Sequence, residues 1–341
     1  MILIRCLLLA AACALLLFCP PSSFPFPLPL LLTDGQLGRA LKFTLALWLV
    51  RDINAGLTRW AENRWMWTAN GGVWNWSKEI AVVTGGSQGI GAAVVKSLVS
   101  HGITVAVLDV QPLSEELQND KSDLIRFYQC DITSRDAVRQ TGEAIRSHHG
   151  APTILINNAG IGNANSILDV TPARLRAIFD VNLLSHWNTV QQFLPDMIAN
   201  KKGHILSVAS LAAFVGLANM TDYCCTKAGL MAFHEGLTQE LKHRYGAPQV
   251  LTSIVYPSWT QTNLTKAIEK GIRGSGASIV EPADVGKAIA AKVISSTSGQ
   301  LVLGPGLAAS VRALPMWVQE WIRDRMAQVV TVNATTASAA A

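Results

Sequence analysis

A tyrosine and a lysine four residues apart, Tyr223 and Lys227, could carry proton chemistry. They fall in a predicted helix, where residues at i and i+4 are neighbours on one face. A free phenol has a pKa near 10, and a nearby ammonium lowers it. Such a phenol can exchange a proton with an alcohol oxygen while a hydride leaves or reaches the carbon. The pair alone is commonplace, so chance spacing stays open as an explanation.

Ser210 makes the pair more specific. It lies thirteen residues before Tyr223, at the end of a predicted strand over 204–210. Ligands bind outside the carboxyl ends of the strands in parallel α/β sheets, so a hydroxyl there could hold the oxygen of a substrate. The three side chains together predict a site that interconverts an alcohol and a carbonyl.

A glycine-rich turn over 84–91 follows the first predicted strand and opens the first predicted helix. Its candidate cofactor-binding residues are Gly85, Ser87, Gln88, Gly89, Ile90 and Gly91. Glycines let a backbone approach a pyrophosphate, and a helix N-terminus attracts its negative charge. The glycine spacing differs from G-x-G-x-x-G, and a purely structural turn is the alternative.

Asp109 ends the second predicted strand, 18 residues after Gly91. A carboxylate there accepts hydrogen bonds from the ribose hydroxyls of an adenosine and repels a 2′-phosphate. No basic residue stands at Ser87 or Gln88, or directly after Asp109, to hold such a phosphate. We therefore predict NAD(H), with NADP(H) possible. The alternative for Asp109 is a solvated acid at a strand end.

Strand and helix patterns alternate from Lys78 onward. Strands are predicted over 79–86, 103–110, 124–131, 153–160, 204–210, 250–257 and 300–304, with helices over 89–102, 134–150, 172–201 and 222–244 and another from Pro282. Continuously apolar strands in such an alternation indicate a parallel sheet covered on both faces. The predicted fold class is α/β, a single doubly wound Rossmann-type parallel sheet of about seven strands.

These residues together resemble the short-chain dehydrogenase/reductase family over roughly 79–305. The resemblance rests on motifs in the family's order: the turn over 84–91, Asp131, the run Asn157-Asn158-Ala159-Gly160, Asn182, Ser210, Tyr223 and Lys227. It implies that Ser210 orients the substrate and that Tyr223 is the acid or base. It also implies that Lys227 binds the nicotinamide ribose and tunes Tyr223, while Asn182 holds a water of a proton relay.

The resemblance implies further cofactor contacts. Asp131 would contact the adenine, and Asn157 would brace the fourth strand. The other implied contacts are Ile132, Asn158, Ala159, Gly160, Pro257 and Thr262. Ser258 stands where the family often has a glycine, which puts the conformation of that loop in question. Residues 258–280 match the family's mobile lid, with Trp259 and Leu264 as candidate pocket walls.

The N-terminal 78 residues carry four of the five net positive charges and long apolar runs over 6–19, 24–32 and 43–50. We expect apolar membrane segments within 1–50 and a basic, Trp-rich linker over 51–78 that lies at a membrane interface, where tryptophan concentrates. A cleaved signal peptide, with the tryptophans packed on the domain, is the alternative.

The remaining boundaries place the enzyme-like domain at 79–308, an amphipathic helix at 309–330 and a disordered tail at 331–341. The amphipathic helix could lie on a membrane or pack on the domain or on another subunit. Half of the residues are hydrophobic and 15% are charged, which excludes a disordered chain. Neither a clustered basic face nor a metal-ligand spacing is present in the sequence, so we expect no nucleic acid and no metal.

Within the family, the anchor and the C-terminal extension are similar to the membrane-associated branch that acts on retinoids, steroids and long-chain alcohols. This implies an oxidoreductase of lipid metabolism that exchanges hydride between NAD(H) and a lipophilic alcohol or carbonyl. It also implies a homo-oligomer at the endoplasmic reticulum or a lipid droplet, with the catalytic domain facing the cytosol. An NADPH-dependent carbonyl reductase and a non-enzymatic membrane or lipid-droplet scaffold are the alternatives.

Overall fold

The chain forms two compact units, residues 1–68 and residues 69–341. The computed structural model describes residues 36–66, 73–162, 164–305, 308–327 and 329–330. The predicted apolar runs over 6–19 and 24–32 and the predicted tail over 331–341 lie outside these residues.

The described part of the first unit is one helix, α3 (Gln36–Glu62). It joins the predicted apolar stretch over 43–50 to the first part of the predicted linker. Several of its large apolar side chains are exposed, including those of Phe43, Trp48 and Val50. Among the residues that the structure describes, no helix combines the length and the apolar character that a membrane crossing needs.

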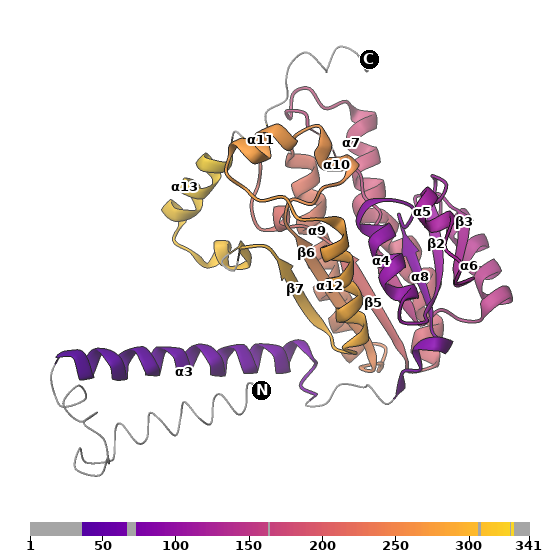
Figure 1. The fold of residues 1–341 in the computed structure, drawn as a ribbon, viewed down its shortest axis with the longest axis horizontal. Helices are drawn as coiled ribbons and strands as arrows, with labels where there is room; N and C mark the ends of the chain where they lie inside the picture. The colour runs from indigo at the N-terminus through magenta and orange to yellow at the C-terminus, as the bar shows by residue number, and fades with distance from the viewer. Residues whose placement is uncertain (1–35, 67–72, 163, 306–307, 328, 331–341) are drawn as a thin grey trace, which may run out of the picture. The chain divides into compact units, whose positions relative to one another are not determined.

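The second unit is built on a seven-stranded sheet (Figure 1). The strands are β1 (Ile80–Thr84), β2 (Thr104–Asp109), β3 (Ile125–Gln129), β4 (Ile154–Asn157), β5 (Gly203–Val208), β6 (Val250–Pro257) and β7 (Gly299–Leu303). Their order is β3-β2-β1-β4-β5-β6-β7, and every neighbouring pair is parallel. The predicted doubly wound parallel sheet is confirmed.

Helices cover both faces of this sheet (Figure 1). The helical elements are η3 (Trp76–Lys78), α4 (Gly89–Val99), α5 (Glu115–Gln118), α6 (Arg135–His149), α7 (Pro172–Phe179), η4 (Asp180–Leu184), α8 (Ser185–Ala199), η5 (Leu211–Ala213), α9 (Thr221–His243), α10 (Asn263–Lys266), α11 (Glu269–Gly274), α12 (Pro282–Ile294), η6 (Ala308–Ala313) and α13 (Met316–Met326). Apolar side chains of α4 and α12 form one core with the sheet, and those of α6, α8 and α9 form a second.

Strand β1 shows why both faces must be covered. Successive side chains of a strand point to opposite faces. Ala81 and Val83 belong to the core under α4 and α12, whereas Val82 belongs to the core under α6, α8 and α9. All three are fully buried. An uninterrupted apolar run is therefore what a central strand of this fold requires.

Two predicted helices are interrupted in the structure. The region over 172–201 contains α7, the π-helical turn η4 and α8 in succession. The region over 309–330 contains the short helix η6 and then α13, with Pro315 at the N-cap of α13. Proline lacks a backbone N–H and cannot continue a helix that arrives from its N-terminal side, which explains the second interruption.

The predicted tryptophan-rich linker contributes to both units. In the first unit, the rings of Trp60 and Trp65 meet edge to face at 4.8 Å. In the second unit, Trp74 and Trp76 stack at 5.3 Å and pack against the core beneath α4 and α12. The end of the linker is therefore part of the domain. For Trp74 and Trp76, this agrees with the alternative that the tryptophans pack on the domain.

Candidate active site

A cavity of about 930 Å³ opens at the carboxyl ends of the central strands. It brings together most of the residues singled out from the sequence: Gly85, Gln88, Gly89, Ile90, Asp109, Asp131, Ile132, Asn158, Ala159, Gly160, Ser210, Tyr223, Lys227, Pro257 and Thr262. Ser87, Gly91 and Asn182 were singled out too, but they lie behind its wall. Residues far apart in the sequence thus meet where ligands bind in such sheets.

The turn after β1 has a shape that only glycine allows. Gly85 and Gly89 adopt positive φ angles of 61° and 55°, which side chains disfavour. A Cβ atom at Gly91 would lie 2.0 Å from the carbonyl oxygen of Gly85. The three glycines of the motif therefore build a tight cradle at the start of α4.

Hydrogen bonds from the end of β4 hold this cradle. The hydroxyl oxygen of Thr84 accepts from the backbone N–H groups of Asn158 at 3.0 Å and Ala159 at 3.1 Å. The Asn158 side-chain amide donates to the carbonyl oxygens of Thr84 at 3.1 Å and Gly85 at 3.0 Å. Thr84 lies within the predicted turn over 84–91, but its bridging role could not be predicted because its partners lie 74 and 75 residues away in the sequence.

The N-terminus of α4 points at the cavity without a capping side chain. Its N-cap residue, Gln88, makes no side-chain hydrogen bond to the helix. The Gln88 side-chain oxygen instead accepts from the Asn263 amide at 2.8 Å, across the mouth of the turn. Uncapped amides at a helix N-terminus bind anions such as phosphate. The turn therefore fits the pyrophosphate of a dinucleotide.

Asp109 is held in a fixed orientation at the end of β2. One carboxylate oxygen accepts from the backbone N–H of Ser87 and the other from that of Gln111, each at 3.0 Å. The Ser87 hydroxyl donates to the Gln111 carbonyl, so Ser87 shapes the turn from behind the cavity wall. The geometry places an acid on the cavity wall, where ribose hydroxyls of a dinucleotide would fit.

Asp131 lies two residues beyond the end of β3 and lines the same cavity. Its carboxylate accepts from both the backbone N–H and the hydroxyl of Thr133, at 2.9 Å and 2.7 Å. Ile132, which follows it, is buried and lines the same cavity. The end of the cavity near β2 and β3 therefore combines a fixed acid with an apolar surface that could accept an adenine.

The three residues of the predicted chemistry meet at the cavity's centre. Tyr223 and Lys227 lie one turn apart on α9, and Ser210 follows β5. The Lys227 ammonium nitrogen lies 5.5 Å from the centroid of the Tyr223 ring and donates to the Val208 carbonyl at 2.9 Å. The ammonium is thus held near the phenol by the end of β5.

The protonation of this pair differs from the sequence-based expectation. Burial raises the pKa of Tyr223 to about 12, and a side-chain hydrogen bond with Ser210 opposes this rise. Burial also lowers the pKa of Lys227 to about 8. We expected the ammonium to acidify the phenol. In the structure burial is the largest cause of both shifts, because removal from water disfavours each charged form.

Two buried residues, Asn182 and His186, lie near Lys227. Asn182 sits in the π-helical turn η4, and its side chain accepts from the N–H of Ile161 at 2.8 Å and donates to the Ile161 carbonyl at 2.9 Å. Its amide therefore braces the chain that leaves β4. His186, which the sequence did not single out, is also buried. Burial and then the Lys227 charge lower its pKa to about 3, so its imidazole is neutral.

The rest of the cavity is an apolar chamber. Trp259 and Leu264 line it, as the sequence predicted, together with Leu211, Val215, Leu217 and Met220. Val311, Ile322 and Met326 of the C-terminal segment also line it, which the sequence pattern did not reveal. Ser258 keeps a negative φ, so serine fits the position where the resemblance suggested glycine.

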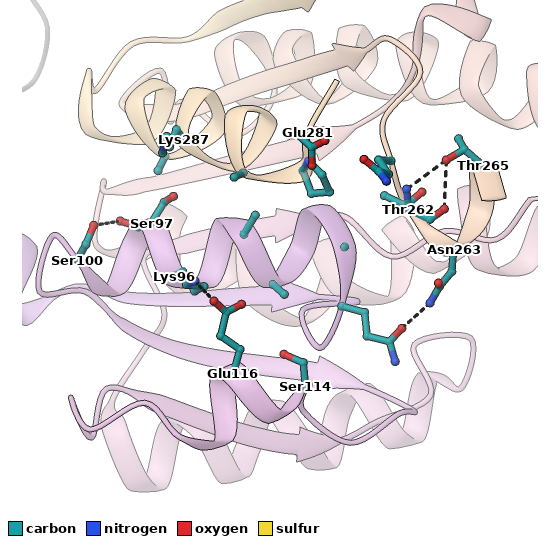
Figure 2. Close-up of a pocket in the computed structure, with 18 of the residues that line it drawn as sticks. Lys96, Ser97, Ser100, Ser114, Glu116, Thr262, Asn263, Thr265, Glu281 and Lys287 are labelled. Atoms are coloured by element: carbon teal, nitrogen blue, oxygen red, sulfur yellow. Dashed lines mark hydrogen bonds and ion pairs between the residues drawn. The ribbon is translucent and has the colours of Figure 1, made fainter. Parts of the chain in front are cut away.

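A second cavity, of about 1210 Å³, lies between α4, α12 and α10 (Figure 2). It shares Gln88, Gly89, Thr262, Asn263 and Thr265 with the first cavity, but Ser210, Tyr223 and Lys227 do not line it. Its charged lining is mixed, and Lys96 is paired there with Glu116. The reactive hydroxyls therefore place the candidate active site in the first cavity.

Comparison with known proteins agrees with this geometry. A family model described as short chain dehydrogenase matches residues 79–273. The chain is 41% identical over 183 residues to dehydrogenase RED2 of Cochliobolus heterostrophus, a match that covers 54% of this chain and 68% of that protein. It is 30% identical over 200 residues to epidermal retinol dehydrogenase 2 of Mus musculus, covering 56% of this chain and 63% of that protein.

A solved structure shares the fold. A metagenomic short-chain oxidoreductase in complex with NADP aligns with a TM-score of 0.55 and 28% identity. The alignment covers 67% of this chain and 98% of that one.

Proposed function

The chain belongs to the short-chain dehydrogenase family of oxidoreductases, and from this premise we propose that it transfers a hydride between NAD(H) and an uncharged, lipophilic alcohol or carbonyl. One observation carries the proposal. The hydroxyls of Ser210 and Tyr223 face one cavity that has a dinucleotide-type cradle on one side and an apolar chamber on the other. The two sides suit a cofactor and a hydrophobic substrate.

The residues that would hold the cofactor are the cradle over 84–91, Asp109, Asp131, the chain over 158–160, Lys227, Pro257 and Thr262. The glycines that admit no side chain and the uncapped α4 N-terminus fit a pyrophosphate. When bound, the nicotinamide accepts or supplies the hydride. The protein's own task is to place the substrate oxygen and to move one proton.

In the proposed mechanism, Ser210 positions the substrate oxygen and Tyr223 exchanges the proton with it. Because burial keeps the phenol protonated at neutral pH, Tyr223 is ready to donate in carbonyl reduction. In alcohol oxidation it must first lose its proton, and the Lys227 charge would stabilise the resulting phenolate. Asn182 braces the chain that leaves β4, and in this proposal it also holds a water of the proton relay.

The charges of the cavity support an uncharged substrate. Among the described residues that line it, the charged side chains are Asp109, Asp131 and Lys227. Both acids lie at the cofactor end, and Lys227 lies at the catalytic centre. A substrate carboxylate or phosphate in the apolar chamber would therefore be buried without a counter-charge, which is costly. Retinoids, steroids and long-chain alcohols are the substrate classes that fit.

Replacing Tyr223 with phenylalanine tests the proposal. The Tyr223→Phe protein should still bind NADH, because its fold and cradle are unchanged, but turnover should fall about 10²- to 10⁴-fold through loss of the proton donor. NADH fluorescence measures both quantities, with retinol, steroids and long-chain alcohols or their carbonyls as substrates. Undiminished turnover in the variant would refute the mechanism.

The preference for NAD(H) over NADP(H) rests on Asp109. A carboxylate held at the end of β2 would repel the 2′-phosphate of NADP(H). Titration with both cofactors should show at least tenfold tighter binding of NADH, and Asp109→Ser should reduce that preference. A clear preference of the unaltered protein for NADPH would instead favour the NADPH-dependent carbonyl reductase.

We also propose that the protein attaches to a membrane, at the endoplasmic reticulum or a lipid droplet, through its N-terminal segment. The apolar run over 6–19 and the exposed apolar side chains of α3, such as Phe43 and Trp48, support this. Attachment would place the catalytic domain beside substrates that dissolve in lipid. Recovery of the full chain in the supernatant after alkaline carbonate extraction of membranes would argue against an inserted segment.

A further inference from the structure

The C-terminal segment, residues 308–330, contributes one wall of the substrate chamber. Val311 of η6 and Ile322 and Met326 of α13 line the cavity. The same three side chains pack in the apolar cluster that contains Tyr223. This segment lies beyond residues 79–273, the part of the chain that the family model matches.

We propose that this segment is a specificity wall that contacts the apolar end of the substrate, and that Arg312 is the positioning residue that holds the wall in register with the catalytic residues. The inference rests on the proposed function and extends it by naming the segment that would determine the preference for substrate chain length.

Three hydrogen bonds fasten the wall to the chain that carries the chemistry. The Arg312 guanidinium donates to the carbonyl oxygens of Ala213 at 3.1 Å and Phe214 at 3.3 Å. At the other end, the Asn219 side-chain amide donates to the Val330 carbonyl at 2.7 Å. All three anchor points lie between Ser210 and Tyr223. A shift of the wall would therefore displace the chain that joins Ser210 to Tyr223.

Helix α13 presents one side to the chamber and another to solvent. Ile322 and Met326 are four residues apart, so they share one helical face, and this is the face that meets the cavity. Met316, Trp317 and Trp321 are exposed on the same helix. The inner side chains can therefore be changed to alter the chamber, and the exposed ones can be changed as matched controls.

The chemistry of the wall specifies what it can accept. Its cavity-lining side chains, those of Ala308, Val311, Ile322 and Met326, are apolar. The Arg312 guanidinium is committed to two carbonyl oxygens. Burial of a hydrocarbon tail against such a surface is favourable, by about fourfold in affinity for each methylene group removed from water. The wall thus fits an alkyl or polyene tail and offers nothing to a phosphorylated or carrier-bound one.

A series of straight-chain primary alcohols from butanol to dodecanol tests the wall through the ratio of kcat/KM for the longest to that for the shortest. In the unaltered protein this ratio should exceed 100. Ile322→Trp should reduce the ratio at least tenfold, because the larger ring occupies the space of the tail. Trp317→Ala, on the exposed face of the same helix, should leave the ratio unchanged.

Arg312 has its own signature as a positioning residue. Arg312→Ala should raise KM for dodecanol at least tenfold while kcat with butanol changes much less, and Arg312→Lys should recover part of the loss by donating one of the two hydrogen bonds. Equal losses for both alcohols, with no recovery in the lysine variant, would show a merely structural role and overturn the assignment.

The wall is also testable if no alcohol is turned over, an outcome that would count against the proposed function alone. Calorimetric titration with the alcohols themselves should then still show tighter binding of dodecanol than of butanol, and Ile322→Trp should remove the difference. If Ile322→Trp does not fold, Ile322→Ala carries the test and should shift the preference toward longer or bulkier alcohols. The wall is overturned if neither turnover nor binding responds to chain length, or if inner and outer variants behave alike.

Discussion

The two ends of the cavity are built in different ways. The cofactor end uses backbone and polar atoms from the first half of the domain, each held by a hydrogen bond, as with Thr84, Asn158 and Asp109. The substrate end uses apolar side chains from segments as distant as 211–220 and 308–326. The comparison teaches that cofactor recognition is encoded in short motifs, whereas substrate recognition depends on how the late segments pack.

The largest expected effect breaks the cofactor end. In Gly91→Ala, the new Cβ would lie 2.0 Å from the Gly85 carbonyl oxygen and 2.6 Å from the Asn158 amide nitrogen, so the cradle must open. NADH affinity measured by fluorescence should fall at least 100-fold. Gly236→Ala, in an open position of α9 with nothing within 4 Å, should leave it unchanged. Equal affinities of the two variants would contradict the cradle.

The next prediction concerns Lys227, which lies between the two ends of the cavity, and it expects opposite effects on activity and on stability. Lys227→Met should lower kcat about 10²- to 10⁴-fold yet raise Tm at pH 7. Burial lowers the pKa of Lys227 to about 8, so at pH 7 the folded protein holds a charge that water would solvate better.

The difference in Tm between Lys227→Met and the unaltered protein should depend on pH. The cost of the buried charge is fully present below pH 8 and disappears as the pH rises toward 10.5, the ordinary lysine value. Calorimetry across this range should show the Tm advantage of Lys227→Met shrinking to nothing. An advantage that grows with pH would mean that Lys227 is not buried as a charge.

A smaller effect concerns the direction of the reaction. Because burial raises the pKa of Tyr223 to about 12, oxidation should speed up as the pH rises from 6 to 8, and it should level off above pH 8, where Lys227 loses the charge that stabilises the phenolate. Reduction should be constant at low pH and fall severalfold once Lys227 loses its proton near pH 8. Profiles of kcat/KM in both directions check this, and identical profiles would exclude the tyrosine as the shared acid and base.

The cofactor end could be predicted from the sequence because its requirements are local. Gly85, Gly89 and Gly91 are needed for the path of a single turn, and Asp109 for the end of a single strand. What the sequence did not show was the locking of this turn by Thr84 and Asn158, since those partners are 74 residues apart.

The substrate end could be predicted only in part. Trp259 and Leu264 were expected because they fall in residues 258–280, which match the mobile lid of the family that the sequence resembles. Ile322 and Met326 were recognised as part of an amphipathic helix, but the surface that the helix meets is set by Arg312, whose partner Ala213 is 99 residues away. The pKa of Tyr223 was also missed, because burial of the pair is a property of the packed site and not of its spacing.

Hydride transfer itself is the most direct test of the central claim. NADH carrying deuterium at the transferring position of the nicotinamide is incubated with the protein and a long-chain or retinoid carbonyl compound, and the alcohol formed is analysed by mass spectrometry. The account predicts one deuterium on the carbinol carbon, and about 10²- to 10⁴-fold less product with Tyr223→Phe. Alcohol formed without the label, or formed equally well by the variant, would contradict it.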